Sequence, residues 1–409
     1  MRENTAMKKK ARAYAKETGE KYVTAQKHIA AQVPEPTAAQ FPAIVTLPIP
    51  TRIPTNIDEA NDMYPGFRMQ LGIDESGDIV GVDLTKNPHA VFFGEPGSGK
   101  SVLARTVIES FRTAGWMIFI GDSDGTDYRE LQQQPGICAI SQRAAEHVRM
   151  VRMVADELRA RQADVSARMK AGEGGLFQYP PLLLVLDDFA RICANVRAEY
   201  GAVPREFDAD LLRIGRTGRE FKVHLIVTSQ YLSRYAFPAG LLDNLSTRVS
   251  IGPSDSLSLF SAFPEAHRNE AAQIIQSIGK RDRGRGLVTF VDDDGDSRIT
   301  EFQAFLGYTP GALNGAPGSE IEIALAKYKR EASEQIPSLY PRFWFQVDGP
   351  QYGQSLADLY ACPMVALDRP DGTPDPDMEQ YDPFHSLYLG APEALPPLML
   401  SFTEKPSTS

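Results

Sequence analysis

One short glycine-rich segment constrains the fold of this chain more than any other feature. Residues 94–101 read Gly-Glu-Pro-Gly-Ser-Gly-Lys-Ser and match the pattern GxxxxGK[ST] at every fixed position. The apolar run 89–93 before this segment predicts a β-strand, and the pattern of 100–113 after it predicts a helix. Glycines allow the backbone to curl with its amides pointing inward, and a helix N-terminus adds positive potential at the same place. The segment is therefore predicted to bind phosphate groups.

The residue types in this segment indicate which contacts each would make with a nucleotide. The predicted ATP-binding residues are Gly94, Glu95, Pro96, Gly97, Ser98, Gly99, Lys100 and Ser101. Lys100 is expected to reach the β- and γ-phosphates as a point charge, and the hydroxyl of Ser101 is expected to complete the coordination of Mg²⁺. ATP and Mg²⁺ are therefore the expected cofactors.

The surrounding sequence, from residue 69 to about residue 306, alternates β-rich runs with helical stretches. The predicted strands are 89–93, 116–121, 182–186, 224–228, 247–251 and 286–291, and the predicted helices include 100–113, 143–169 and 208–219. This alternation is typical of an α/β domain with a largely parallel sheet.

A continuous aliphatic run followed by two carboxylates indicates a second part of the site. Residues 182–186 are all aliphatic and Asp187 and Asp188 follow them, as expected for a parallel strand that is buried on both faces. Because an ionised pair at this position is costly without a cation, Asp187 is expected to hold Mg²⁺ through water and Asp188 to polarise the attacking water. The alternative is that both residues cap the N-terminus of a helix.

Four blocks of the sequence resemble the FtsK/SpoIIIE branch of the FtsK and HerA superfamily, across roughly residues 69–306. The blocks are residues 88–102 with the glycine-rich loop, 121–127 (Gly-Asp-Ser-Asp-Gly-Thr-Asp), 184–190 with Asp-Asp-Phe-Ala, and 213–230. The resemblance implies a P-loop ATPase core of RecA-like type, and it implies that Gln230 at the end of the last block senses the γ-phosphate. A side-chain amide suits this task because it can both donate and accept a hydrogen bond.

Two positions depart from the family pattern. Asp188 replaces the usual Glu, so its carboxylate lies one methylene further from the attacking water and hydrolysis is expected to be slow. Asp124 replaces the usual Lys of the second block, which exchanges a positive charge for a negative one and leaves the role of this position open. A module that binds ATP but hardly turns it over is therefore a further hypothesis.

The resemblance also implies a homo-oligomer, a ring of six copies. In such rings an arginine of one subunit completes the site of the next, and this residue can raise the rate by about 10³ to 10⁵. Arg216 and Arg219 are the preferred candidates for this role, and Arg248 is a third. The alternative for each of them is an ordinary surface or structural ion pair.

The function that the resemblance implies is a motor that pulls double-stranded DNA through the ring. The formal net charge of −10 argues against a surface that coats nucleic acid, but a ring can be acidic outside and basic along its channel. Candidate DNA contacts are the basic segment 280–285 and two basic helices expected at 7–18 and 21–31. Their alternatives are a solvated loop and an arm that docks a partner.

We therefore expect an ATP-dependent DNA translocase that acts in the transfer or mobilisation of a plasmid, an integrative element or phage DNA. The alternative is an ATPase of a protein-secretion system of type VII, or a regulatory ATPase that does not move DNA. Type VII ATPases share the fold and also tolerate Asp-Asp after the strand. In those proteins several such domains usually follow a membrane anchor, so the single domain expected here favours DNA.

Composition divides the chain into four parts. The predicted parts are a basic helical arm at 1–33, a Pro-rich linker and lead-in at 34–68, the ATPase domain at 69–308 and an acidic, Pro-rich region at 309–409. In the last part, the aromatic cluster Phe343, Trp344 and Phe345 is expected to pack in a small core or docking strand, since base-stacking platforms come with basic grooves. No apolar run reaches the roughly 18 residues that span a bilayer, and no secretory signal is recognised. A cytoplasmic location is expected, with the termini as contacts for any membrane or secretion partner.

Overall fold

The fold is described from a computed structural model of the chain. It covers residues 41–173, 178–232, 237–279, 282–292, 294–311, 316–347 and 356–389. All the elements named below belong to one compact unit, Pro42–Ser409. The helices predicted at 7–18 and 21–31 lie outside the described residues, as do Lys280 and Arg281 of the basic segment.

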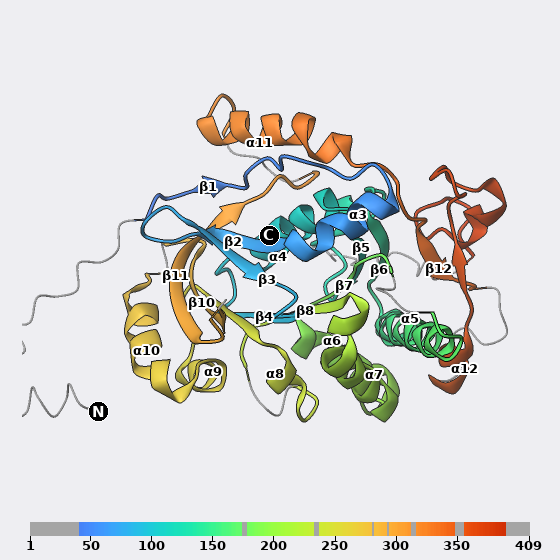
Figure 1. The fold of residues 1–409 in the computed structure, drawn as a ribbon, viewed down its shortest axis with the longest axis horizontal. Helices are drawn as coiled ribbons and strands as arrows, with labels where there is room; N and C mark the ends of the chain where they lie inside the picture. The colour runs from blue at the N-terminus through green and yellow to red at the C-terminus, as the bar shows by residue number, and fades with distance from the viewer. Residues whose placement is uncertain are drawn as a thin grey trace, which may run out of the picture. The chain divides into compact units, whose positions relative to one another are not determined.

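Short strands alternate with helices along most of this unit (Figure 1). The strands are β1 (Val45–Thr46), β2 (Arg68–Ile73), β3 (Ile79–Asp83), β4 (His89–Phe93), β5 (Met117–Asp122), β6 (Ile137–Ser141), β7 (Leu182–Asp187), β8 (Val223–Ser229), β9 (Thr247–Ile251), β10 (Arg285–Val291), β11 (Ser297–Leu306), β12 (Phe343–Phe345) and β13 (Met364–Ala366). The helices are α3 (Ile57–Met63), α4 (Lys100–Thr113), α5 (Ala144–Lys170), α6 (Phe189–Tyr200), α7 (Arg205–Thr217), α8 (Leu241–Asn244), α9 (Ser256–Ala262), α10 (Arg268–Ser277), α11 (Glu320–Glu331) and α12 (Leu356–Ala361).

A mixed sheet lies at the centre of the unit. Within the described residues its strand order is β3-β2-β11-β10-β9-β4-β8-β7-β5-β6, and β1 pairs with β11. The strands from β9 to β6 in this order are parallel, while β10, β11, β2 and β3 extend the sheet with antiparallel pairs. This arrangement confirms the predicted α/β class with a largely parallel sheet. Since β8 lies between β4 and β7, the C-terminal ends of these three strands meet at one edge of the sheet.

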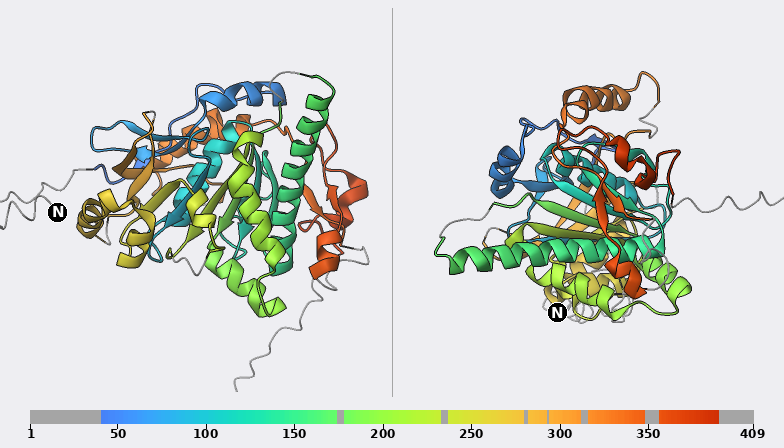
Figure 2. Two further views of the ribbon diagram at one scale, coloured as in Figure 1. Left: turned by 60° about the horizontal axis from the view of Figure 1, so that its bottom comes forward. Right: turned by 90° about the vertical axis from the view of Figure 1, so that its right-hand side faces the viewer.

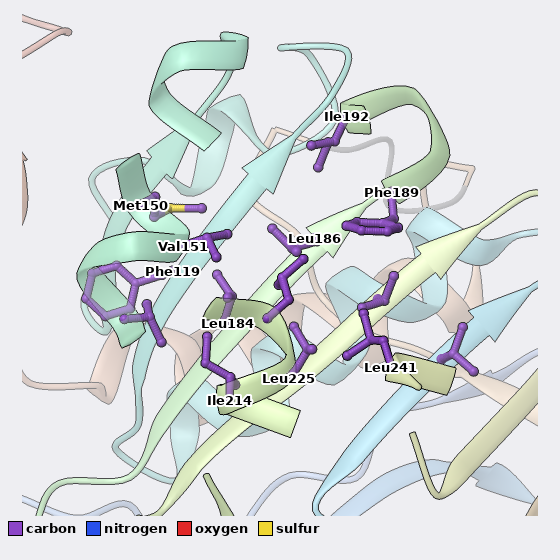
Figure 3. Close-up of a cluster of buried hydrophobic side chains, with 14 of the residues drawn as sticks. Phe119, Met150, Val151, Leu184, Leu186, Phe189, Ile192, Ile214, Leu225 and Leu241 are labelled. Carbon is purple, nitrogen blue, oxygen red and sulfur yellow. The ribbon is translucent and has the colours of Figure 1, made fainter. Parts of the chain in front are cut away.

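Both faces of the parallel strands are buried under helices. Successive residues of a strand point to opposite faces, so Leu184 packs in the layer with α5, α6 and α7, and Leu183 packs in the layer with α4. Figure 3 shows part of the first layer, where Leu184 and Leu225 face Ile214 of α7. The right-hand view of Figure 2 shows α5 on one side of the sheet and α11 on the other. Burial on both faces explains why these strands are almost continuously aliphatic.

The strands and helices predicted for the core agree with the structure within a few residues. The strands 89–93 and 247–251 and the helix 100–113 have the predicted bounds. Helix α7 begins three residues earlier than predicted and ends at Thr217, so Arg219 lies beyond it in the 3₁₀ turn η3 (Arg219–Phe221). The sequence patterns did not predict β2, β3, β6 or β11, nor the helices α6, α9, α10 and α11.

The described part of region 309–409 packs on the same unit as the ATPase core. Helix α11 buries Tyr328 beside Phe305 of β11. Strands β12 and β13 form a small antiparallel sheet, and Trp344 and Phe345 join the hydrophobic layer on the α5 side. The prediction that this aromatic cluster packs in a core is therefore confirmed. Among the described residues, no helix combines the length and the apolar character needed to cross a bilayer.

Candidate active site

The glycine-rich segment forms the loop between β4 and α4. Gly94, Gly97 and Gly99 have φ angles of 151°, 77° and 108°, which residues with a side chain rarely adopt. A Cβ atom on Gly94 would lie 2.2 Å from the carbonyl oxygen of Ile251 in β9, so only glycine allows the strand end to approach this closely. The loop opens at the N-terminus of α4, where an anion is electrostatically favoured.

The ammonium group of Lys100 lies inside this loop. Its Nζ donates hydrogen bonds to the carbonyl oxygens of Gly94 at 2.8 Å and Glu95 at 2.9 Å. Burial lowers the pKa of Lys100, and the carboxylates of Asp188 and Asp187 oppose this shift. The ammonium group of Lys100 can exchange these two carbonyl partners for phosphate oxygens, which is the role expected of it from the sequence.

Asp187 ends β7 and is 6% exposed. Ser101 Oγ donates to its Oδ2 at 3.3 Å, and Thr228 Oγ1 donates to its Oδ1. Burial raises the pKa of Asp187 to about 6, although the hydrogen bond from Thr228 lowers it. A hydroxyl and a carboxylate are the oxygen donors that Mg²⁺ prefers, so Ser101 and Asp187 fit a site for this ion.

The side chain of Asp188 points toward Gln230 and does not cap helix α6. It is the N-cap residue of α6 and has the left-handed φ and ψ angles 48° and 62°, yet its side chain makes no capping hydrogen bond. Its Oδ2 instead accepts a hydrogen bond from Gln230 Nε2 at 3.0 Å. Left-handed backbone in a residue with a side chain stores strain, which is common at functional sites. This geometry favours a role in the site over the capping alternative.

Thr228 is a site residue that the sequence analysis did not single out. Its Oγ1 accepts a hydrogen bond from the backbone N of Asp188 at 2.8 Å and donates to the carboxylate of Asp187. One hydroxyl therefore fixes both consecutive acidic residues. The signal available in the sequence was a polar residue near the end of an otherwise apolar strand.

The loop after β5 lies close to these carboxylates. Asp122 accepts hydrogen bonds from three backbone amides of this loop, and its charge contributes to raising the pKa of Asp187. Asp124, which stands where the family has Lys, forms an ion pair with Arg191 of α6. The acidic residue therefore ties the loop to the helix that begins directly after Asp188.

The candidate arginines lie away from the loop of their own chain. Arg216 and Arg219 are exposed, and Arg219 shortly precedes the first residue of β8, at the edge of the sheet opposite the glycine-rich loop. Arg248 donates to the backbone carbonyl oxygens of Leu242, Leu245, Ser261 and Ala262. These four hydrogen bonds favour the alternative of a structural role for Arg248 within its own chain.

The structure describes two arginines of the basic segment 280–285, one buried and one exposed. Arg285 is 8% exposed and pairs with Glu301 at 2.6 Å. Arg283 is exposed.

The glycine-rich loop after β4 and the two carboxylates at the end of β7 thus lie on either side of β8, an arrangement typical of a P-loop nucleotide site. Residues 57–172 match the model of the FtsK/SpoIIIE family. These residues are therefore similar to the FtsK/SpoIIIE family over less than a third of the chain. The matched residues include the glycine-rich loop and Asp124, and end before β7.

Curated relatives are of two kinds. The chain is 24% identical over 303 residues to the DNA translocase FtsK of Corynebacterium efficiens, covering 66% of this chain and 31% of that protein. It is 26% identical over 215 residues to the ESX-4 secretion system protein EccC4 of Mycobacterium tuberculosis, covering 46% of this chain and 16% of that protein. The chain thus spans less than a third of the length of either relative. Among solved structures, the pCW3 conjugation coupling protein TcpA gives a TM-score of 0.48 at 19% identity, covering 66% of this chain and 71% of that one.

Proposed function

We propose that this chain hydrolyses ATP with the residues gathered at the ends of β4, β7 and β8. The glycine-rich loop and Lys100 hold the phosphates, and Ser101 with Asp187 holds Mg²⁺, which would neutralise charge on the phosphate oxygens. Asp188 polarises the attacking water. Gln230, hydrogen-bonded to Asp188, senses the γ-phosphate and couples its presence to the position of that carboxylate. The hydrogen bond between Asp188 and Gln230 is the observation that carries this proposal.

We further propose that hydrolysis drives the movement of double-stranded DNA, in the transfer or mobilisation of a plasmid, integrative element or phage, in the cytoplasm. Support comes from the relatives that are DNA translocases. Movement of a secreted protein is the second candidate function, because the ESX secretion proteins are relatives at similar identity.

Stimulation of the ATPase distinguishes these two functions. The purified chain is assayed for ATP hydrolysis alone and with long double-stranded DNA, at low and at physiological salt. A DNA motor is expected to accelerate with DNA and to lose this stimulation as salt rises, since phosphate contacts release counterions. Turnover that is indifferent to DNA would instead favour the secretion or regulatory function. Absence of turnover under all conditions would leave a nucleotide-binding module.

We also propose that six copies assemble into a ring in which Arg216 or Arg219 acts on the site of the neighbouring copy. Both side chains are exposed, and Arg219 lies at the edge of the sheet away from its own loop, which suits a residue that acts in trans. Specific activity should then rise with protein concentration across the range in which the ring assembles.

Mixing two inactive variants tests this directly. Lys100→Ala lacks a working loop and Arg216→Ala lacks the proposed donor, so mixed rings contain some sites with an intact loop beside an intact arginine. Activity is expected to recover on mixing, with Arg219→Ala tested in the same way. Arg213→Ala, an exposed residue of the same helix, is the control and should stay active alone. No recovery with either arginine would exclude a role in trans for both.

A further inference from the structure

A cavity lies at the edge of the sheet opposite the glycine-rich loop. Met117 and Leu182, the first residues of β5 and β7, form its floor, and α5 forms one wall. Phe343 and Met364, the first residues of β12 and β13, form the other wall. The cavity has a volume of about 390 Å³, which is in the range of sites for small ligands.

One charged side chain in this cavity is buried without a full set of partners. Arg149 of α5 is 8% exposed, and its Nε donates to the carbonyl oxygen of Cys362 at 2.8 Å. Its Nη1 is buried and has no hydrogen-bond partner within the part of the chain that the structure describes. Buried polar groups are nearly always hydrogen-bonded, and an incompletely paired guanidinium is costly. An acceptor in the cavity would remove this cost.

The acidic side chains at the rim of the cavity have other partners. Asp156 forms an ion pair with Arg159, and Glu157 pairs with Arg161 at 2.7 Å. Each of these carboxylates is held by an arginine of its own helix. Asp156 also opposes the lowering of the pKa of Arg149 by burial, but no carboxylate within the described residues forms an ion pair with this guanidinium.

The rest of the lining is apolar and adaptable. Methionines contribute from the sheet, from α5 and from β13, and Phe119 packs against Phe343 with ring centroids 6.4 Å apart. Thioether side chains are flexible and polarisable, so they fit apolar groups of varied shape.

We propose that this cavity binds an apolar group that ends in a carboxylate, with the carboxylate on Arg149 and the apolar part among the methionine and phenylalanine side chains. A free aliphatic acid and the C-terminus of an apolar peptide share this chemistry. The site is separate from the nucleotide loop and does not depend on what the ATPase moves.

Calorimetric titration of the full chain tests the proposal with probes that differ in one group. Octanoate is compared with octanol, and acetyl-trileucine with a free C-terminus is compared with its amide. At least one acid is expected to bind saturably and about tenfold or more tightly than its neutral partner, because a hydrogen bond to a charged group is involved. The pair that shows this preference identifies the source of the carboxylate. No preference in either pair would overturn the proposal.

Two variants locate the binding. Arg149→Met is expected to remove the preference for the acid, whereas Arg168→Met, on the same helix but outside the cavity, should keep it. Arg149 also donates a hydrogen bond to the carbonyl oxygen of Cys362, so its replacement could disturb the fold. A second variant, Ala160→Trp, therefore narrows the cavity from an exposed position and leaves the guanidinium of Arg149 in place. The acid that binds to the wild-type chain should bind to Ala160→Trp about tenfold or more weakly, with unchanged ATPase activity. Wild-type binding to Ala160→Trp, or an unchanged acid preference in Arg149→Met, would place the ligand elsewhere.

Discussion

At the scale of single residues, the hydroxyl of Thr228 positions both Asp187 and Asp188 through hydrogen bonds. Thr228→Val has a similar volume but loses the hydrogen bonds to Asp187 and to the backbone of Asp188. Because a hydrogen bond to a charged group contributes about 1.5–3 kcal/mol, kcat for ATP hydrolysis should fall roughly ten- to hundredfold. Steady-state assays measure the change, and Thr228→Ser should retain most of the activity. Full activity in the valine variant would exclude this positioning role.

Asp188 gives a second prediction at this scale. Its short side chain places the carboxylate one methylene further back than the family's glutamate, and Gln230 holds it there. Asp188→Glu is expected to raise kcat, whereas Asp188→Asn, which cannot act as a base, should lower it by about 10²-fold or more. Nucleotide affinity, measured by titration with a fluorescent ATP analogue, should change little in both variants. A glutamate variant slower than wild type would show that the site is shaped for aspartate.

The sequence predicted those site residues whose neighbours are close in the chain. The glycine-rich loop, Lys100 and Ser101 lie in one short segment, so their geometry follows from local backbone conformation. The hydrogen bond from Thr228 to Asp187 joins residues 41 apart, and the ion pair of Asp124 with Arg191 joins the loop after β5 to helix α6. These contacts depend on which strands are neighbours in the sheet, and no local pattern contains that information.

At the scale of secondary-structure elements, the small sheet of β12 and β13 is expected to stabilise the core. Trp344 is 3% exposed in the hydrophobic layer on the α5 side, and its Nε1 donates to Tyr388 Oη at 2.9 Å. Trp344→Ala should lower the free energy of unfolding by about 3–5 kcal/mol, because it leaves a large cavity. Denaturant unfolding measures the loss, and Phe384→Ala, at a 40% exposed position, serves as the control with little effect. A cost below about 1 kcal/mol would mean that this sheet packs only loosely on the core.

The burial pattern of each strand explains why some strands were predicted from the sequence and others were not. Strands such as β4 and β7 are buried on both faces and are therefore continuously apolar, which is a strong signal. Strand β11 begins exposed and ends buried, with Glu301 and Gln303 among its apolar residues, so neither a continuous run nor a regular alternation is present. Strand β11 was missed for this reason, whereas its neighbour β10 and the parallel strands at the centre of the sheet were predicted.

At the scale of the whole molecule, buried histidines link stability to pH. His89, His147 and His224 are at most 1% exposed, and burial lowers their pKa values to about 3, 4 and 4. In the unfolded chain their pKa is near the ordinary value of about 6.5, so between about pH 4 and 6.5 the unfolded state binds more protons. The stability that these neutral side chains contribute is therefore fully present above about pH 6.5 and is lost as the pH falls through this range.

The melting temperature is accordingly expected to fall between about pH 7.5 and pH 5. His147→Asn isolates one of the three groups: it can keep a hydrogen bond to Ser141, which lies 2.7 Å from Nδ1, but it cannot titrate in this range. The variant should melt lower at neutral pH because the side chain is smaller, yet its melting temperature should depend less steeply on pH. An equally steep dependence in His147→Asn would show that other groups dominate the acid sensitivity, because removing a buried histidine must reduce the proton uptake that accompanies unfolding.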